Sequence, residues 1–506
     1  MFRRRSRAVR SFPTGLLPLL LPLLTLLLTL LLGASGRPAR AQPGPTSRWY
    51  FGHRAGVDFA TGEPVAIDAS AMDALEGSAV MSDSAGQLLF YTNGQTVWNR
   101  NHAPMANGLA LQGVESGAQP ALIVPQPGSR TRYYLLLADA QAGTVNPGGC
   151  GCLASVVVDM ALDSGRGEVV DRPRLIYRLT TEKLAAVTQT DDSTFWILSH
   201  EWYSDAFRAY PLTATGVGLT PVISHVGQVH GRDPDPTHLL VPGANAIGGM
   251  VISPDGKHVA IAVLASSFAE VFDFDRRTGV VSNPAFLPLP IVGSVGSAGC
   301  YGVAFSPNSQ RLYVTRYLPT RRTDLHQFTL SGPRAGVAAT AVALPGVGSA
   351  LQLGLDGKLY GIGPLDPALS VVARPDAAGV DCGVRLNAIP LQLPQSGSLG
   401  LPNFLVRVVE PAPVPPGLAG LLPNILTPNA DGLNDALQPA RLLPVGAGGE
   451  LRVFSRWGQL VFATTDLAAG WPAAGATGTY FYDLRLTVPA GAGSRPTVRG
   501  WVEVVR

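Results

Sequence analysis

The chain has 506 residues, of which 38 are Lys or Arg and 35 are Asp or Glu, so its formal net charge is only +3. Charged side chains make up 14%, and beyond the N-terminal region they show no clustering of Lys and Arg, which argues against a surface that binds nucleic acid. The 58 glycines and 43 prolines favour many short strands joined by tight turns.

The first 41 residues have the three parts of a secretory signal peptide. Five arginines within the first ten residues precede an apolar run, Leu16–Leu32, and Ala39-Arg40-Ala41 forms the cleavage site. The run is short for a membrane-spanning helix, and an uncleaved N-terminal anchor is the alternative. We therefore predict a signal peptide over 1–41 and no transmembrane helix after its cleavage. Because 1–41 holds seven basic residues and no acidic one, the mature chain is net acidic.

One pattern recurs between residues 48 and 408: an apolar strand, a turn of Asp, Asn, Ser or Gly, and a second apolar strand. The turns lie near residues 86, 128, 192, 256, 308 and 357, with a mean step of about 54 residues. Hairpins repeating at about this period are typical of β-propeller blades. The sequence predicts an all-β fold whose first domain, 48–408, is a propeller of six to seven blades, with seven favoured.

Seven blades require a closure of the ring. We expect the strand near Trp49–Phe51 to pair with strands near Leu399–Val408, because closure removes exposed strand edges. An array of β-sandwiches is the alternative, although its domains of about 100 residues exceed the repeat.

The four cysteines, Cys150, Cys152, Cys300 and Cys382, permit three disulfide connectivities. A bond between Cys150 and Cys152 closes a very small ring and is expected to be labile. The spacing does not match the paired CxxC of a zinc site, so buried thiols or one ordinary disulfide are expected.

A Pro-rich stretch, Glu410–Gly417, predicts a semi-rigid linker over 409–420. The remaining residues, 421–506, predict a small antiparallel β-sandwich. Leu451–Arg456 and Leu460–Thr464 flank a hairpin turn at Trp457-Gly458, and Gly500–Arg506 forms a terminal strand. The strand Tyr480–Leu486 lies between this hairpin and the terminal strand. One of its faces carries the expected core residues Tyr480, Tyr482, Leu484 and Leu486.

Four motifs mark this C-terminal region. They are Thr427-Pro-Asn-Ala-Asp-Gly-Leu-Asn-Asp435, Phe454-Ser-Arg-Trp-Gly-Gln-Leu-Val-Phe462, Gly478-Thr-Tyr-Phe-Tyr482 and Gly500-Trp-Val-Glu-Val-Val-Arg506. In this order they closely resemble the gliding-motility-associated C-terminal domain, the Ig-like type B sorting domain of the type IX secretion system. The residues that carry the resemblance are Pro428, Asn429, Asp431, Gly432, Asn434, Asp435, Arg456, Trp457, Gly458, Gly478, Tyr480 and Tyr482.

The resemblance implies a route and a partner. The signal peptide would take the chain to the periplasm of a Gram-negative bacterium, and the type IX machinery at the outer membrane would deliver it to the cell surface or the medium. The segments Trp49–Phe59, Leu88–Gly94 and Val97–His102 resemble the N-terminal, WD40-like propeller region common in proteins with this sorting domain. That second resemblance implies an architecture and carries no reaction with it.

Catalytic signatures are missing from the sequence. It has no nucleophile elbow, no Walker A motif and no zincin motif. One polar stretch could ligate Zn²⁺ or a similar ion through its imidazole and carboxylate groups, which are His225, His230, His238, Asp233 and Asp235. A Pro-punctuated loop between blades is the expected alternative. The stretch His200-Glu201-Trp202-Tyr203 could form an acid–base site. We expect instead that it ends a strand whose aromatic residues pack between blades.

A calcium site is the one local ion site that the sequence suggests. Asn429, Asp431, Asn434 and Asp435 offer side-chain oxygens around a glycine turn, as hard cations require. A network of Asx turns is the alternative reading. For the whole protein we expect a propeller that acts as a binding or scaffold module, adhesin-like, toward an extracellular glycan or protein. A secreted propeller enzyme that acts on glycans or peptides is the alternative.

Overall fold

The computed structural model separates into two compact units, divided between Arg407 and Val408. The predicted signal peptide (1–41) and linker (409–420) lie outside the described residues. The structure describes residues 44–68, 70–139, 150–191, 193–231, 244–265, 267–289, 299–317, 323–408, 422–429, 434–439, 448–455, 460–473, 477–487 and 497–505.

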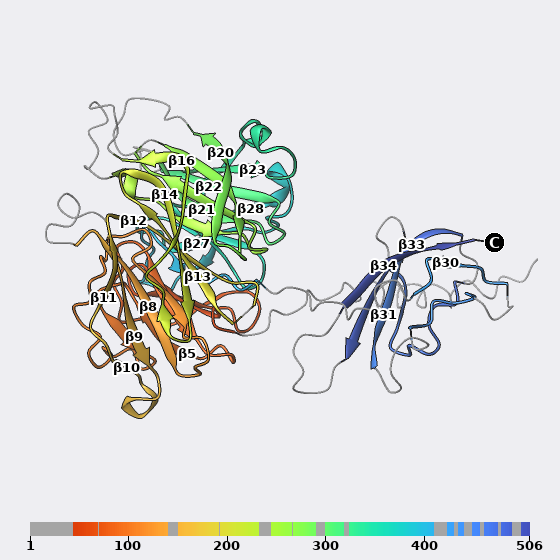
Figure 1. Ribbon diagram of the computed structural model, residues 1–506, viewed down its shortest axis with the longest axis horizontal. Helices are drawn as coiled ribbons and strands as arrows, with labels where there is room; N and C mark the ends of the chain where they lie inside the picture. The colour runs from red at the N-terminus through yellow and green to blue at the C-terminus, as the bar shows by residue number, and fades with distance from the viewer. Residues whose placement is uncertain are drawn as a thin grey trace, which may run out of the picture. The chain divides into compact units, whose positions relative to one another are not determined.

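Seven sheets, antiparallel except for one short parallel pair, make up the described part of the first unit, and Figure 1 shows them running from orange to cyan along the chain. The first three sheets contain β1 (Arg48–Phe51), β2 (Ala55–Asp58) and β3 (Val65–Ala66); β4 (Ser78–Ser82), β5 (Leu88–Thr92) and β6 (Val97–Asn99); and β7 (Ala121–Pro125), β8 (Arg132–Asp139), β9 (Cys152–Asp159), β10 (Glu168–Val169) and β11 (Arg174–Arg178).

The other four sheets follow the same up-and-down order. They contain β12 (Thr180–Thr188), β13 (Phe195–Glu201), β14 (Ser204–Thr213), β15 (Gly216–Val217) and β16 (Val222–His230); β17 (Met250–Ile252), β18 (His258–Val263), β19 (Phe268–Asp275) and β20 (Val280–Pro288); β21 (Gly299–Phe305), β22 (Arg311–Tyr317), β23 (Thr323–Thr329) and β24 (Val342–Pro345); and β25 (Ala350–Leu353), β26 (Leu359–Ile362), β27 (Ala368–Val372) and β28 (Val384–Pro390). Short 3₁₀ turns lie at η1 (Asp163–Gly165), η2 (Ala244–Ala246), η3 (Arg334–Thr340) and η4 (Gly379–Cys382).

The sheets form a ring of seven blades. The first strands of successive sheets pack against one another, from β1 to β4, β7, β12, β17, β21 and β25. The last and first sheets then share a core, in which Trp49 and Phe51 pack with Tyr360 and Ile362. The all-β propeller prediction is confirmed, with the favoured count of seven blades.

No helix in the described part of the chain is long and apolar enough to cross a membrane.

The six turns identified in the sequence each join the first and second strands of a blade. In the fifth blade, Ser253 N–H donates to His258 O at 2.9 Å, and Gly256 N–H donates back to Ser253 O at 2.8 Å. Gly256 has φ +69°, a left-handed conformation that glycine adopts without strain. The turns near residues 86, 128, 308 and 357 have the same pair of hydrogen bonds, which explains why the hairpin repeat was visible in the sequence.

The expected closure of the ring is wrong. β1 pairs with β2 and not with residues 399–408. Instead β29 (Pro402–Asn403) pairs in parallel with β4, and Val406 forms a parallel bridge with Val187 of β12. The segment 399–407, here called the axial segment, therefore runs alongside the inner strands of two different blades. The ring closes through side-chain packing between its first and last sheets.

The second unit contains a five-stranded sheet in the order β30-β34-β33-β31-β32, drawn in blue in Figure 1. Its strands are β30 (Ile425–Leu426), β31 (Gly448–Ser455), β32 (Leu460–Thr464), β33 (Gly478–Thr487) and β34 (Thr497–Val504). Pairing is antiparallel except between β30 and β34. Tyr482, Leu484 and Leu486 are buried and Tyr480 packs beside them, as predicted for the core face. Segments that include Leu437, Leu467 and Trp471 cover this face.

Candidate functional site

Two of the four C-terminal motifs, those that contain Tyr482 and Gly500, are in direct contact in the second unit. Gly500 of β34 lies opposite Tyr482 of β33, and a Cβ at Gly500 would overlap the Tyr482 hydroxyl and ring. Tyr480 packs edge-on against Trp471, with ring centroids 4.8 Å apart. Gly478, which opens β33, has φ +112°. Arg456, Trp457 and Gly458 lie outside the described residues.

The predicted calcium loop is only partly described, because Asp431 and Gly432 lie outside the described residues. Asn429 N–H donates to Asp435 Oδ1 at 3.0 Å, and Thr427 N–H donates to Asn434 O at 2.9 Å. Asn429 and Asn434 are exposed, Pro428 and Asp435 are partly buried, and Asn434 has φ +52°. These hydrogen bonds are of the kind expected for an Asx-turn network. The calcium site remains a prediction.

A row of apolar side chains crosses the solvent face of the same sheet. Phe454 lies opposite Phe481, and Phe481 lies opposite Trp501 on the next strand. Phe481 and Trp501 are each 48% exposed, whereas a soluble sheet usually presents polar side chains on this face. Directly paired aromatic residues of this kind form a continuous patch, here called the aromatic row (Phe454, Phe481 and Trp501).

The histidines of the predicted metal stretch have opposite surroundings where the structure describes them. His225 is exposed, and its Nδ1 lies 2.7 Å from Asp205 Oδ1. His230 is fully buried, and its ring stacks on that of His200 with centroids 3.8 Å apart. Burial lowers the pKa of His200 to about 3 and that of His230 well below its usual value. Asp233, Asp235 and His238 lie outside the described residues.

The stretch His200-Glu201-Trp202-Tyr203 has a structural role in the described blade. The His200 ring also meets Phe207 edge-on, with centroids 4.7 Å apart, and Glu201 forms an ion pair of 2.6 Å with Arg208. Trp202 is buried, while Tyr203 is half exposed and has φ +63° at the turn into β14. A carboxylate held by an arginine and a histidine kept neutral by burial do not form an acid–base pair.

A cluster of buried titratable groups lies where the inner strands begin, and the sequence analysis missed it. Glu182 and Lys183 are consecutive residues of β12 and are 3% and 0% exposed. Glu182 Oε2 accepts a hydrogen bond from Ala118 N–H at 2.8 Å. Lys183 Nζ donates to the carbonyl oxygens of Ala246 and Ile247 at 3.1 and 3.2 Å. Two adjacent charged residues within an otherwise uncharged, buried strand were the available sequence signal.

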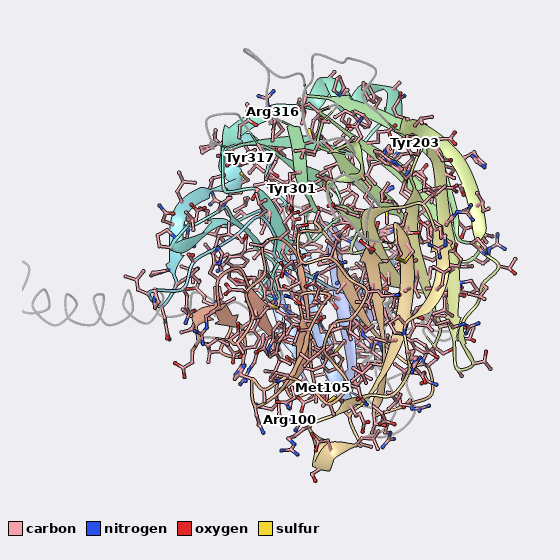
Figure 2. All side chains as sticks on the ribbon, turned by 90° about the vertical axis from the view of Figure 1, so that its left-hand side faces the viewer. Arg100, Met105, Tyr203, Tyr301, Arg316 and Tyr317 are labelled. Carbon is pink, nitrogen blue, oxygen red and sulfur yellow. A yellow bond between two sulfur atoms is a disulfide. The ribbon has the colours of Figure 1, made fainter. Side chains whose placement is uncertain are left out.

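Glu76 and Tyr301 belong to the same cluster. The Tyr301 hydroxyl donates to Glu76 Oε2 at 2.5 Å, across a sequence separation of 225 residues. Burial, together with the nearby Glu182 carboxyl group, raises the pKa of Glu76 well above its usual value. Burial likewise raises the pKa of Glu182 and lowers that of Lys183. In Figure 2, Tyr301 lies closer to the middle of the ring than Tyr203, Arg316 or Tyr317.

The axial segment passes directly from this cluster along the inner strands. Gly400 lies so close to Glu76 and Gly77 that a Cβ there would overlap their backbone. Asn403 Nδ2 donates to Leu184 O at 2.8 Å, next to Glu182 and Lys183. A cavity of about 40 Å³ remains between Tyr301, Gln119 and Asn403. Farther along, a mostly apolar cavity of about 240 Å³ lies between Met250, Phe305, Leu351, Phe404 and Arg407.

Comparison with known proteins identifies the second unit. Residues 421–504 match the CHU_C type IX secretion signal domain. The protein is therefore a cargo of the type IX secretion system, exported to the cell surface or secreted. No curated protein matches the chain.

Solved structures give distant likenesses. A protein from Lactobacillus plantarum has 13% identity and a TM-score of 0.41, with 70% of this chain and 98% of that chain covered. A periplasmic gluconolactonase from Pseudomonas aeruginosa has 16% identity and a TM-score of 0.34, with 78% and 94% covered. TolB from Acinetobacter baumannii has 9% identity and a TM-score of 0.34, with 75% and 70% covered. The seven-bladed architecture rests on the strand pairing described above.

Proposed function

We propose that the exported propeller is a binding or scaffold module, adhesin-like, whose outer loops and blade surfaces hold an extracellular glycan or protein. The observation that carries this proposal is that the buried acidic cluster has almost no free space beside it, because the axial segment lies against it. Propellers commonly build small-molecule sites where their inner strands converge. Here the cavity beside Tyr301 measures about 40 Å³, which is room for a few water molecules and not for a sugar ring. The larger cavity of about 240 Å³ is mostly apolar, and no Asp, Glu, His or Cys is among its described lining residues.

The acidic cluster supports the enzymatic alternative less well. Glu76 and Glu182 are a pair of carboxyl groups with raised pKa values, as acid–base catalysts often are. Both carboxyl groups already have protein partners, Tyr301 for Glu76 and the Ala118 amide for Glu182. A buried network of this kind stabilises the junction between blades when each polar group has a partner. We therefore assign the cluster to the structure of the ring.

The test follows binding and turnover on the same protein. The full chain is screened against arrays of glycans and peptides, beside the Glu182→Gln variant, which keeps the size and one acceptor oxygen of the side chain. We expect at least one ligand to bind without being converted, with equal affinity for both proteins. Turnover by the parent chain that is lost in Glu182→Gln would establish the enzyme instead.

Export by the second unit is tested separately. Cells that produce the full chain are compared with cells that produce a chain ending at Pro416, and the outer membrane, the periplasm and the medium are assayed. The shorter chain should remain in the periplasm, because it lacks residues 421–504. Surface delivery of the shorter chain would contradict the assignment of these residues as its sorting signal.

A further inference from the structure

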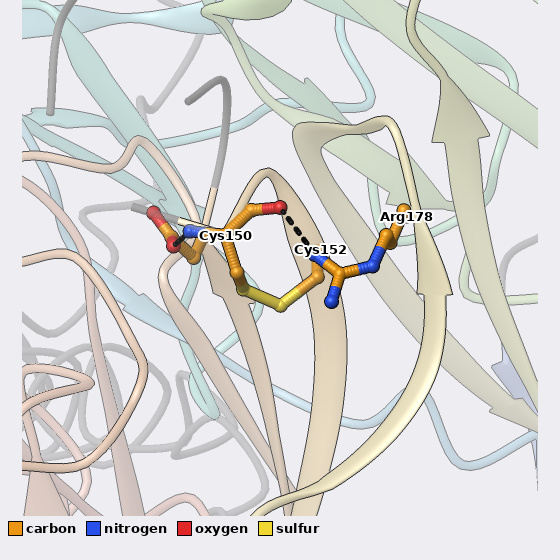
Figure 3. Close-up of a disulfide and its surroundings, with 4 residues drawn as sticks. Cys150, Cys152 and Arg178 are labelled. Carbon is orange, nitrogen blue, oxygen red and sulfur yellow. Dashed lines mark hydrogen bonds between the residues drawn. A yellow bond between two sulfur atoms is a disulfide. The ribbon is translucent and has the colours of Figure 1, made fainter. Parts of the chain in front are cut away.

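The third blade carries two cysteines and a carboxylate at the open end of one hairpin. Asp139 is the last residue of β8 and lies opposite Cys152, the first residue of β9. Cys150 and Cys152 form a disulfide, while Cys300 and Cys382 are buried free thiols, so none of the three connectivities that pair all four cysteines is present. Figure 3 shows the disulfide in its turn, with the Arg178 guanidinium group beside it.

The backbone holds the two cysteines in place by contacts that do not use their sulfur atoms. Gly151 between them has φ +56°, a left-handed turn that glycine permits. Gly151 O accepts hydrogen bonds from Leu179 N–H at 2.6 Å and Thr180 N–H at 3.2 Å. Arg178 Nη1 donates to Cys150 O at 3.5 Å. The turn is therefore tied to the neighbouring segment whether or not the two sulfur atoms are bonded.

Three ligand atoms converge at this turn. One carboxylate oxygen of Asp139 and the Sγ atoms of Cys150 and Cys152 all lie within 4.8 Å of one another. The Asp139 carboxylate also accepts a hydrogen bond from Cys150 N–H, which aims the carboxylate at the cysteine pair. Asp139 and Cys152 are 3% and 1% exposed, whereas Cys150 is partly exposed, so solvent reaches the site from one side.

We propose that Asp139, Cys150 and Cys152 form a thiolate metal site that the disulfide closes and that reduction opens. Two thiolates and one carboxylate match the donors that Zn²⁺ accepts in a tetrahedral site, with a fourth position left for water. Their three negative charges exceed the charge of the ion by one, and the Arg178 guanidinium group supplies a neighbouring positive charge. The site needs no CxxC spacing, because Asp139 comes from the paired strand.

The redox step requires a dithiol reductant. The dithiol gives two electrons and two protons to the Cys150–Cys152 bond, which becomes two thiols, and the dithiol itself becomes a cyclic disulfide. Cys150 is the more exposed of the two residues and is therefore the expected point of attack. Zn²⁺ then displaces the two thiol protons as it binds, so affinity should rise with pH until both thiols are ionised.

The test uses the full chain, reduced with dithiothreitol and freed of it under anaerobic conditions, with Co²⁺ as a spectroscopic substitute for Zn²⁺. We expect one Co²⁺ per chain and a thiolate-to-cobalt charge-transfer absorption, neither of which the oxidised chain shows. Cys150→Ser and Cys152→Ser should each abolish the absorption, and Asp139→Asn should weaken binding by about tenfold or more. Cys382→Ser is the matched control and should bind as the parent does.

A second measurement needs no variant. In the reduced parent chain, Zn²⁺ should protect Cys150 and Cys152 from alkylation, as mass spectrometry of the peptides would show. The proposal is wrong if the reduced chain binds no Co²⁺ and gains no protection. It is equally wrong if the absorption persists in a variant that lacks both Cys150 and Cys152.

Discussion

Gly500 and Tyr482 face each other across β34 and β33, and the tyrosine ring occupies the space that any larger residue at position 500 would need. Two motifs that are 18 residues apart in the sequence are therefore the two halves of one cross-strand contact. Tyr482 is 8% exposed and belongs to the core of the secretion signal domain. Gly500 permits that burial, because its bare Cα leaves room for the hydroxyl end of the ring.

Gly500→Ala should therefore loosen the secretion signal domain. The new methyl group would push the Tyr482 ring away from its place in the core, at a cost of roughly 1–3 kcal/mol in the free energy of unfolding. Hydrogen exchange of the full chain should be faster than in the parent in β33 and β34 and unchanged in the propeller. Gly336→Ala is the control, since a Cβ at Gly336 contacts nothing within 4 Å. Unchanged exchange in Gly500→Ala would contradict the close contact.

The aromatic row predicts a second effect, on export. Phe481 and Trp501 are exposed, so their replacement by serine should leave the sheet folded. Because the domain is a secretion signal, we predict that the row contacts the export machinery. The double variant Phe481→Ser/Trp501→Ser should then reach the surface several-fold less, as fractionation and immunoblotting would show. Arg485→Ser, which changes an exposed residue of the same strand, is the matched control. Normal export of a folded double variant would rule out this contact.

The structure shows why the sequence revealed the blades and not their closure. Each hairpin joins neighbouring strands through a turn of a few residues. The turn residues and the apolar pattern of both strands therefore lie within one short stretch of sequence, where they can be recognised together. The axial segment pairs residue 402 with residue 78, and no local pattern encodes a contact over that separation. The same reason hid the acidic cluster, since Glu76, Glu182 and Tyr301 come from three blades. The C-terminal core face was predicted correctly because it lies on one strand, β33.

The burial of the Glu270 carboxyl group leads us to expect that the stability of the propeller depends on pH. It lies on β19, is 1% exposed, and accepts a hydrogen bond from Gln228 N–H at 3.1 Å. Burial raises its pKa from 4.5 to about 7. A carboxyl group with a raised pKa holds its proton more tightly in the folded chain. Its contribution to stability is therefore complete below pH 4.5 and is lost as the pH rises through about 7.

Glu270→Gln removes this titration and keeps an acceptor oxygen. The parent chain should lose up to about 3 kcal/mol relative to the variant between pH 4.5 and 7.5, measured by urea unfolding of the propeller. Glu63→Gln is the control with the opposite sign. Glu63 is exposed, and its ion pair with Lys358, at 2.8 Å, lowers its pKa. Parallel stability curves for the parent and Glu270→Gln would show that Glu270 is ionised in the folded chain at pH 4.5 to 7.

The loop with Asn429 and Asp435 gives the last prediction, which separates a cation site from a turn. Asp435→Ala removes the oxygen that accepts the Asn429 amide proton and should cost about 1 kcal/mol in stability. Asp435→Asn keeps that oxygen and removes the charge, so it should retain most of the stability. If calcium binds through Asn429, Asp431, Asn434 and Asp435, Ca²⁺ should raise the melting temperature of the parent and not of Asp435→Asn, because a hard cation needs the carboxylate charge. Calorimetric titration of the full chain should then show heat only with the parent. No heat, and equal melting of both proteins with and without Ca²⁺, would mean that hydrogen bonds alone hold the loop.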